Sequence, residues 1–186
     1  MEKTVGFIIA VVVVVLLVSL IGIYNTLVKS RQRVRNSWSQ VDVQLQRRFD
    51  MIPNLIEIVK GYMKHEEEVL TKVVQLRTAW GNSESITQKA ELGNELGGMI
   101  HKIFAVSEQY PELKANESFT VLQGQINETE SKIAFSRQFY NDSVTIYNTK
   151  LEMFPCNLVA GMFHFKPETL FNLESDEIRK NVEVKF

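Results

Sequence analysis

The sequence has 186 residues, with 21 basic and 22 acidic residues and a formal net charge of -1. This balance leaves no surplus of positive charge for phosphate backbones, so we expect no nucleic-acid partner. The mean hydropathy of -0.09 argues against several membrane spans, and the single cysteine, Cys156, excludes an intramolecular disulfide.

The first predicted element is a transmembrane helix. Residues 5–24 carry no charge and have the length of about 20 residues with which a helix crosses a hydrocarbon core. The alternative is a cleavable signal peptide, whose apolar stretch is shorter and ends in small residues, whereas this one ends at Tyr24 and Asn25. We therefore expect residues 1–28 to be a short tail and a retained anchor, which makes the chain a single-pass protein of the cell membrane.

Basic residues gather directly after the span, at Lys29, Arg31, Arg33 and Arg35. Before the span, Lys3 is offset by Glu2. The positive-inside rule then predicts that the N-terminus lies outside and that the rest of the chain is cytoplasmic. The same cluster suits attraction to anionic membrane lipid, at about 1 kcal/mol per charge.

Apolar residues then repeat at steps of three and four, which predicts helices. The first leaves the membrane with its stripe at Val34, Trp38, Val41, Leu45 and Ile52, and Pro53 ends or kinks it. The others are expected over residues 55–80, 92–110 and 115–154, separated by residues 81–83 and Pro111 and stopped by Pro155. The fourth helix repeats at sevens, with Phe119, Ile126, Ile133, Tyr140, Tyr147 and Phe154.

The apolar stripe of one helix can be removed from water by packing against the stripe of another helix. We expect an all-α fold in which the transmembrane helix continues into an antiparallel up-down bundle of four long helices, residues 29–154. Residues 155–186 form a C-terminal apolar tail, with Leu158, Val159, Met162, Phe163, Phe165, Leu170 and Phe171. The favoured interpretation is a cap over the membrane-proximal end of the bundle, and the alternative is contact with the bilayer interface or a neighbouring subunit.

Patterns for catalysis, cofactors and metals are not found in the sequence. His65, His101 and His164 do not pair at helical spacing, and no glycine-rich phosphate loop or nucleophile elbow is present. Cys156 has no neighbouring base and is expected to be structural. We therefore predict no catalytic, cofactor-binding or metal-binding residues and a protein that is not an enzyme.

Several other residues are predicted to be structural. Gly93 and Gly97 suit a tight helix crossing, and Glu128 and Glu130 should lie on different faces of their helix. In the segment that contains Trp38, Arg47, Arg48 and Asp50, the pair Arg47 and Asp50 can form a surface ion pair worth about 0.2 to 0.5 kcal/mol. Arg47 and Arg48 lie roughly 30 Å from the end of the span in an upright helix, which is too far for lipid contact.

Residues 24–66 resemble the signature of the LemA family, and residues 110–115, 130–141, 144–148 and 154–155 resemble its later motifs in the same order. The resemblance covers nearly the whole chain. It implies a bacterial protein with an N-terminal membrane anchor and an antiparallel helical bundle, and it supplies no catalytic residues. It also implies a likeness to a magnetosome membrane component and an association with membrane metallopeptidases of the HtpX type.

Two functional hypotheses follow. The first is a membrane-anchored helical scaffold that self-assembles as a homo-oligomer or docks partners, membrane proteins included, at the membrane surface in envelope organisation. The second is an adaptor or sensor that regulates a membrane protease of the HtpX type. A scaffold should form large particles alone, whereas an adaptor should stay small until its partner is added.

Overall fold

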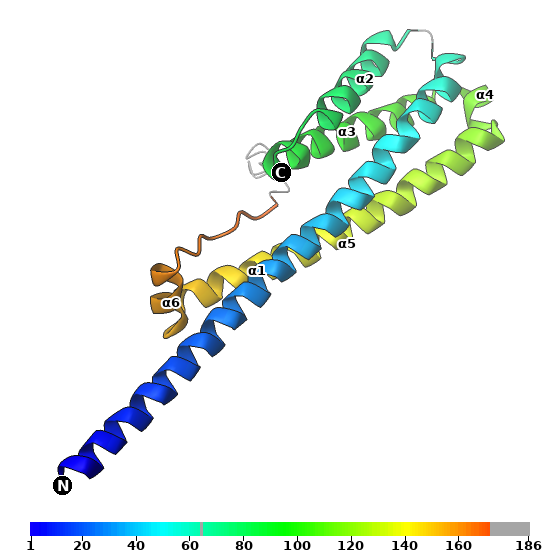
Figure 1. The fold of residues 1–186 in the computed structure, drawn as a ribbon. Coiled ribbons are helices and arrows are strands. Elements are labelled where there is room, and N and C mark those ends of the chain that lie inside the picture. Colours follow the sequence, from blue (N-terminus) through cyan, green and yellow to red (C-terminus); the bar gives the residue numbers. More distant parts are fainter. Residues whose placement is uncertain (64, 172–186) are drawn as a thin grey trace, which may run out of the picture. The chain divides into compact units, whose positions relative to one another are not determined.

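The computed structural model describes residues 1–63 and 65–171, and every regular element in this part of the chain is a helix (Figure 1). The predicted all-α class is thus confirmed. The helices are α1 (Glu2–Lys60), α2 (Glu67–Gly81), α3 (Ile86–Ser107), α4 (Pro111–Lys114), α5 (Glu117–Glu152) and α6 (Cys156–Met162). The last part of the predicted tail, residues 172–186, lies outside the described residues.

The chain divides into two compact units, and α1 and α5 contribute to both. Unit 1 contains residues 1–39 and 138–170, which include the N-terminal part of α1, the end of α5 and α6. Unit 2 contains residues 40–137, with α2, α3 and α4, and Phe171. The predicted division at residues 28 and 154 is not tested by these units and stays a prediction.

Pro53 does not end the first helix, so of the two outcomes predicted for it, an end or a kink, the end was wrong. It stands inside α1, and Leu55 and Val59 beyond it are 0% exposed, on the same stripe as Leu45 and Ile52. A proline inside a helix costs about 3 kcal/mol, while burial of each of these side chains returns about 1.5 to 3 kcal/mol. The break comes instead after Lys60, so the second predicted helix is divided between the end of α1 and α2.

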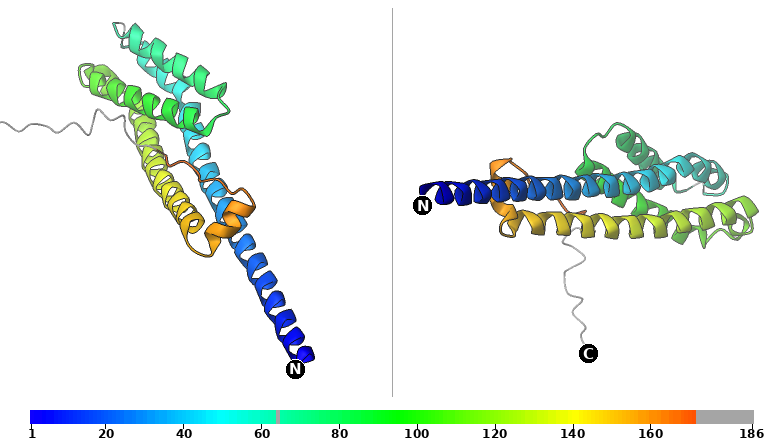
Figure 2. Two further views of the ribbon diagram at one scale, coloured as in Figure 1. Left: turned by 90° about the vertical axis from the view of Figure 1, so that its left-hand side faces the viewer. Right: turned by 60° about the horizontal axis from the view of Figure 1, so that its bottom comes forward.

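The core of unit 2 is formed by α2, α3, the C-terminal part of α1 and the first part of α5. Helices α2 and α3 lie side by side in both views of Figure 2. Trp80 stacks on Phe49 with ring centroids 4.4 Å apart, and Phe104 meets Phe119 edge to face at 6.1 Å. These pairs join α1 to α2 and α3 to α5 through large buried surfaces.

The predicted heptad phase of α5 is confirmed over five of its six positions. Phe119, Ile126, Ile133, Tyr140 and Tyr147 are each at most 3% exposed. Phe154 is 77% exposed, because α5 ends at Glu152 before the sixth position is reached.

In unit 1 the tail packs against α1 and α5. Val159 and Ala160 of α6 form a buried cluster with Leu27, and Phe165 packs on it. His164, with φ of 55°, turns the chain after α6, and the Phe165 amide donates to the Ala160 carbonyl at 3.0 Å. Figure 2 shows α6 beside α1 and next to the end of α5. The short helix was not predicted, and the expected cap over the membrane-proximal end of the bundle stays a prediction.

Hydrogen bonds hold the extended segment after α6 along α5. The Tyr147 hydroxyl donates to the Lys166 carbonyl at 3.0 Å, and the Tyr140 hydroxyl donates to the Thr169 carbonyl at 2.9 Å. Asn148 donates to the Glu168 carbonyl at 2.8 Å and accepts from the Glu168 amide at 3.0 Å. Burial raises the pKa of both tyrosines, so they remain neutral donors at physiological pH.

Candidate functional site

The apolar N-terminal stretch of α1 is open to its surroundings. Residues from Val11 to Val18 are between 47% and 64% exposed, and the helix that contains them is long and apolar enough to cross a membrane. Beyond Tyr24 the same helix continues to Lys60 without a break. The apolar stretch and the first part of the bundle are therefore one helix.

The tail lies at the end of this apolar stretch. Leu20, Ile23 and Tyr24 pack against the cluster of Leu27 and α6. The Tyr24 ring lies 4.8 Å from the Phe163 ring and 5.7 Å from the Phe165 ring. An aromatic cluster therefore stands at the end of the apolar stretch.

An exposed apolar face stands beside that cluster. It consists of Phe154, Leu158 and Met162, spaced by four residues, which are 77%, 64% and 55% exposed. Leu158 and Met162 lie along one side of α6, whereas Phe154 lies in the turn between α5 and α6. This part of the chain therefore has a packed side, which includes Val159, and an exposed side, which includes these three residues.

The predicted basic cluster lies in the same unit and uses aromatic partners. Arg31 lies over the Phe165 ring at 4.9 Å, and Arg33 lies over the Phe139 ring at 5.5 Å. Such contacts hold a guanidinium without neutralising its charge. The Trp38 ring meets the Tyr140 ring edge to face at 5.6 Å, which joins α1 to α5 in this unit.

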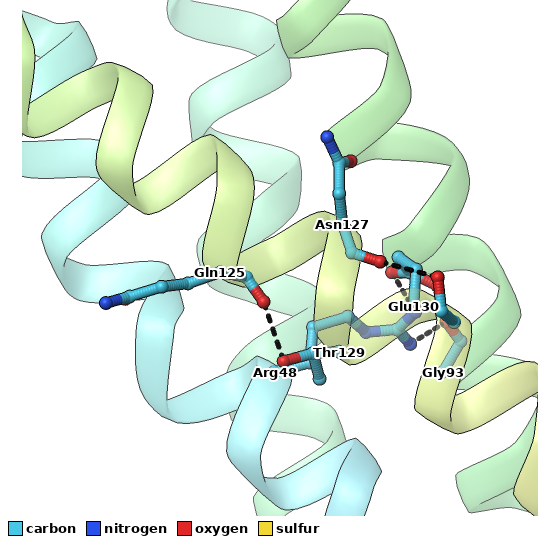
Figure 3. Close-up of polar contacts among 7 residues, drawn as sticks. Arg48, Gly93, Gln125, Asn127, Thr129 and Glu130 are labelled. Atoms are coloured by element: carbon cyan, nitrogen blue, oxygen red, sulfur yellow. Dashed lines mark hydrogen bonds and ion pairs between the residues drawn. The ribbon is translucent and has the colours of Figure 1, made fainter.

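A buried polar centre occupies unit 2 (Figure 3). Arg48 is 1% exposed, and its Nη1 donates to Glu130 Oε1 at 2.6 Å. Its Nη2 donates to the Gly93 carbonyl. A Cβ atom at Gly97 would lie 3.1 Å from Nη1 of Arg48, so the predicted tight crossing at Gly93 and Gly97 is confirmed as the space that holds this guanidinium.

Sequence reasoning missed the burial of Arg48, although a signal was available. Arg48 falls between Leu45 and Ile52 on the buried stripe of α1, so its position alone predicts an inward side chain. The expected pair of Arg47 and Asp50 was wrong. Asp50 accepts from Gln46 Nε2 at 2.7 Å, and the ion pairs within residues 1–63 and 65–171 include none with Arg47.

The two glutamates near this centre point to different faces, as predicted. Glu130 binds Arg48, whereas Glu128 accepts from Lys132, which holds the pKa of Glu128 below its usual value. A second arginine, Arg137, is largely desolvated, and burial together with the charge of Arg48 lowers its pKa to about 10. It stacks on the Phe171 ring at 4.4 Å, while its Nε and Nη2 atoms have no hydrogen-bond partner.

The histidines and the cysteine lie apart. His65, His101 and His164 are exposed, and no three His, Cys, Asp or Glu side chains converge as metal ligands within the described chain. Cys156 is half-buried against the cluster of Leu27 and α6. The geometry therefore offers exposed apolar and basic surfaces in unit 1 and a structural ion pair in unit 2.

Comparisons with known proteins agree with the sequence motifs. The chain is 27% identical to a protein named LemA from Metamycoplasma hominis over 75% of this chain and 64% of that relative. It is 23% identical to the magnetosome protein MamQ 2 of Paramagnetospirillum magneticum over 86% of this chain and 68% of that relative. It is 21% identical to MamQ of Magnetospirillum gryphiswaldense over 80% and 64% of the two chains. Residues 37–186 match the model of the LemA family, so the chain belongs to the LemA family.

Proposed function

We propose that this protein is a membrane-anchored helical scaffold that self-assembles and docks partners at the membrane surface. The observation that carries the proposal is the exposed apolar face of Phe154, Leu158 and Met162 beside the end of the apolar stretch of α1. Apolar side chains so exposed are typical of surfaces that bind a membrane or another protein. The likeness to relatives named as magnetosome proteins is consistent with an organising role.

Two exposed apolar side chains of α5 in unit 2 support assembly between copies. Val121 and Phe135 are 54% and 71% exposed and stand two heptads apart on one side of the helix, with Glu128 midway between them. A closed assembly of identical chains would bury these two side chains against a surface of the neighbouring copy. We place the bundle on the cytoplasmic side, because the basic residues from Lys29 to Arg35 follow the apolar stretch.

The test measures particle mass. Full-length protein in detergent is sized by mass photometry and imaged by electron microscopy, alone and as the variant Val121→Ser with Phe135→Ser. We expect multimers for the native chain and smaller particles for the variant. Val43→Ser is the matched control, because Val43 is an exposed valine of α1 in the same unit at 62% exposure.

Two results would contradict the scaffold. Particles of one chain at all concentrations would exclude self-assembly. Growth of such particles only after a membrane protease is added would instead support the adaptor or sensor hypothesis.

A further inference from the structure

A pocket of about 250 Å³ lies between α1 and α5 in unit 1, and its charge is entirely positive. Lys29 and Arg33 line it from α1, and Lys150 lines it from α5, while no Asp or Glu takes part. None of these three cations belongs to an ion pair within the described part of the chain. Three positive charges without an acidic partner around one small pocket favour the binding of an anion there.

The polar groups of the pocket are arranged as donors. Lys150 Nζ donates to Ser30 Oγ at 2.7 Å, which leaves two of its three ammonium protons for another acceptor. The guanidinium of Arg33 is steadied by the Phe139 ring at 5.5 Å. Arginine can bind two oxygens of a phosphate at once, and lysine adds a point charge. The chemistry therefore fits a phosphate group.

The depth of the pocket indicates where that phosphate comes from. Lys29 is five residues beyond Tyr24, which corresponds to about 7 Å along a helix. The headgroup layer of one leaflet is about 5 to 7 Å thick. Lys150 is held near this level by Ser30. A phosphate at the edge of the hydrocarbon core would thus meet both lysines.

The surface below the pocket can accommodate an acyl chain. Thr26, which lines the pocket, is followed toward the N-terminus by Gly22 and Val18 at steps of four, so these residues share its side of α1. A Cβ atom at Gly22 would have no neighbour within 4 Å, and Val18 is 64% exposed. Ile146, in the wall of the pocket, is 45% exposed.

We propose that this pocket binds the phosphate headgroup of an anionic phospholipid, with Lys29, Arg33 and Lys150 as its ligands. The proposal rests on the membrane anchor of the proposed function and names one lipid class for it. The bound lipid would fix the depth of unit 1 at the membrane.

The experiment is native mass spectrometry of the full-length protein in detergent. The probes are dioleoyl phosphatidylglycerol, dioleoyl phosphatidylcholine and inorganic phosphate, each titrated separately and then in competition. The variant carries Lys29→Gln, Arg33→Gln and Lys150→Gln. The matched control carries Lys60→Gln, Arg77→Gln and Lys102→Gln, which removes three exposed cations of unit 2 that form no described ion pair.

We expect the native chain and the control to bind one phosphatidylglycerol about tenfold more tightly than phosphatidylcholine. The variant should bind the two lipids equally. Lys29→Glu, a single change at an exposed position, should lower the preference without affecting circular dichroism. Equal binding by the native chain, or an unchanged preference in the variant, would overturn the proposal.

Inorganic phosphate separates the two possible sources of the anion. Displacement of phosphatidylglycerol by millimolar phosphate would show a site for a soluble anion and overturn the lipid assignment. Particle mass is recorded on the same samples. A preference for phosphatidylglycerol in particles of one chain would support the lipid site and contradict the scaffold. Multimers that bind both lipids equally would support the scaffold and contradict the lipid site.

Discussion

Arg48 and Glu130 form an ion pair that joins α1 to α5 inside unit 2, with 2.6 Å between Nη1 and Oε1. Arg48 is 1% exposed and Glu130 is 24% exposed, so the arginine has lost nearly all contact with water. The pair and the Gly93 carbonyl together offset this desolvation. Removal of either partner therefore leaves a buried group without compensation.

The first prediction concerns this pair. Arg48→Met should lower the free energy of unfolding by about 3 kcal/mol, because Glu130 and the Gly93 carbonyl lose their donor. Arg47→Met, at the exposed neighbouring position, should change it by less than about 0.5 kcal/mol. Thermal unfolding followed by circular dichroism measures both. Similar losses in the two variants would contradict the structural role of Arg48.

The second prediction is that Arg137→Met stabilises the protein at pH 7 by about 0.5 to 1 kcal/mol, because the native side chain is desolvated and Nε and Nη2 are unpaired. Burial, with the charge of Arg48, lowers the pKa of Arg137 from 12.5 to about 10. Below pH 10 the native chain bears the whole penalty of the buried charge, and above it the folded state releases the proton.

The advantage of Arg137→Met should therefore shrink as the pH rises above about 10. Unfolding in urea at several pH values measures this difference. An advantage that grows over this range would contradict the assignment.

The third prediction compares two adjacent glycines of α3. Gly98→Ala should stabilise the protein by up to about 1 kcal/mol, because its Cβ meets open space and alanine favours helix. Gly97→Ala should destabilise it by about 1 to 3 kcal/mol, because its Cβ would press on Arg48, which Glu130 holds in place. Melting temperatures that rise in both variants would show that the guanidinium can move aside.

The fourth prediction concerns the heptad phase of α5. Ile133 is 0% exposed, so Ile133→Asp should cost about 3 to 5 kcal/mol through a buried unpaired charge. Lys132→Ala removes an exposed ion pair with Glu128 and should cost less than about 0.5 kcal/mol. Denaturant unfolding distinguishes the two, and equal midpoints would mean that the phase is wrong.

The fifth prediction concerns the tail. Truncation after Phe154 removes the buried Val159 and the hydrogen bonds to Tyr140 and Tyr147, so the free energy of unfolding should fall by at least about 2 kcal/mol. Truncation after Phe171 is the control, because it keeps all of these contacts. The melting temperature of each form is compared with that of the full chain. No loss in the shorter form would exclude a packing role for the tail.

Periodicity predicted the helical class and the inward positions of α5, because burial repeats with the turn of the helix. It failed where two local effects compete. Pro53 normally ends a helix, but the apolar stripe on both sides of it continues in phase, and burial outweighs the lost hydrogen bond. Helix α6 has seven residues, too few for a repeat to be recognised.

The candidate site was only partly predictable. The basic residues after the span were found from charge alone, whereas Lys150 joins them through a contact 120 positions away in the sequence. The burial of Arg48 was not predicted, because arginine side chains usually stay at the surface. Its partner Glu130 and the space opposite Gly97 are brought to it by tertiary packing, which a local pattern does not contain.

The buried hydroxyl groups of α1 and α5 do not fix how the two helices are aligned along each other. Ser37, Thr129 and Ser143 each donate to a carbonyl of their own helix, at 2.7, 2.8 and 2.8 Å. Such side chains are satisfied whichever residue faces them, so they do not distinguish one register of the two helices from another. Polar contacts that cross between the helices do distinguish it: Arg48 with Glu130 in unit 2, and Lys150 with Ser30 in unit 1. Each unit thus has one polar contact that would be lost if the two helices shifted by one heptad, a displacement of about 10 Å.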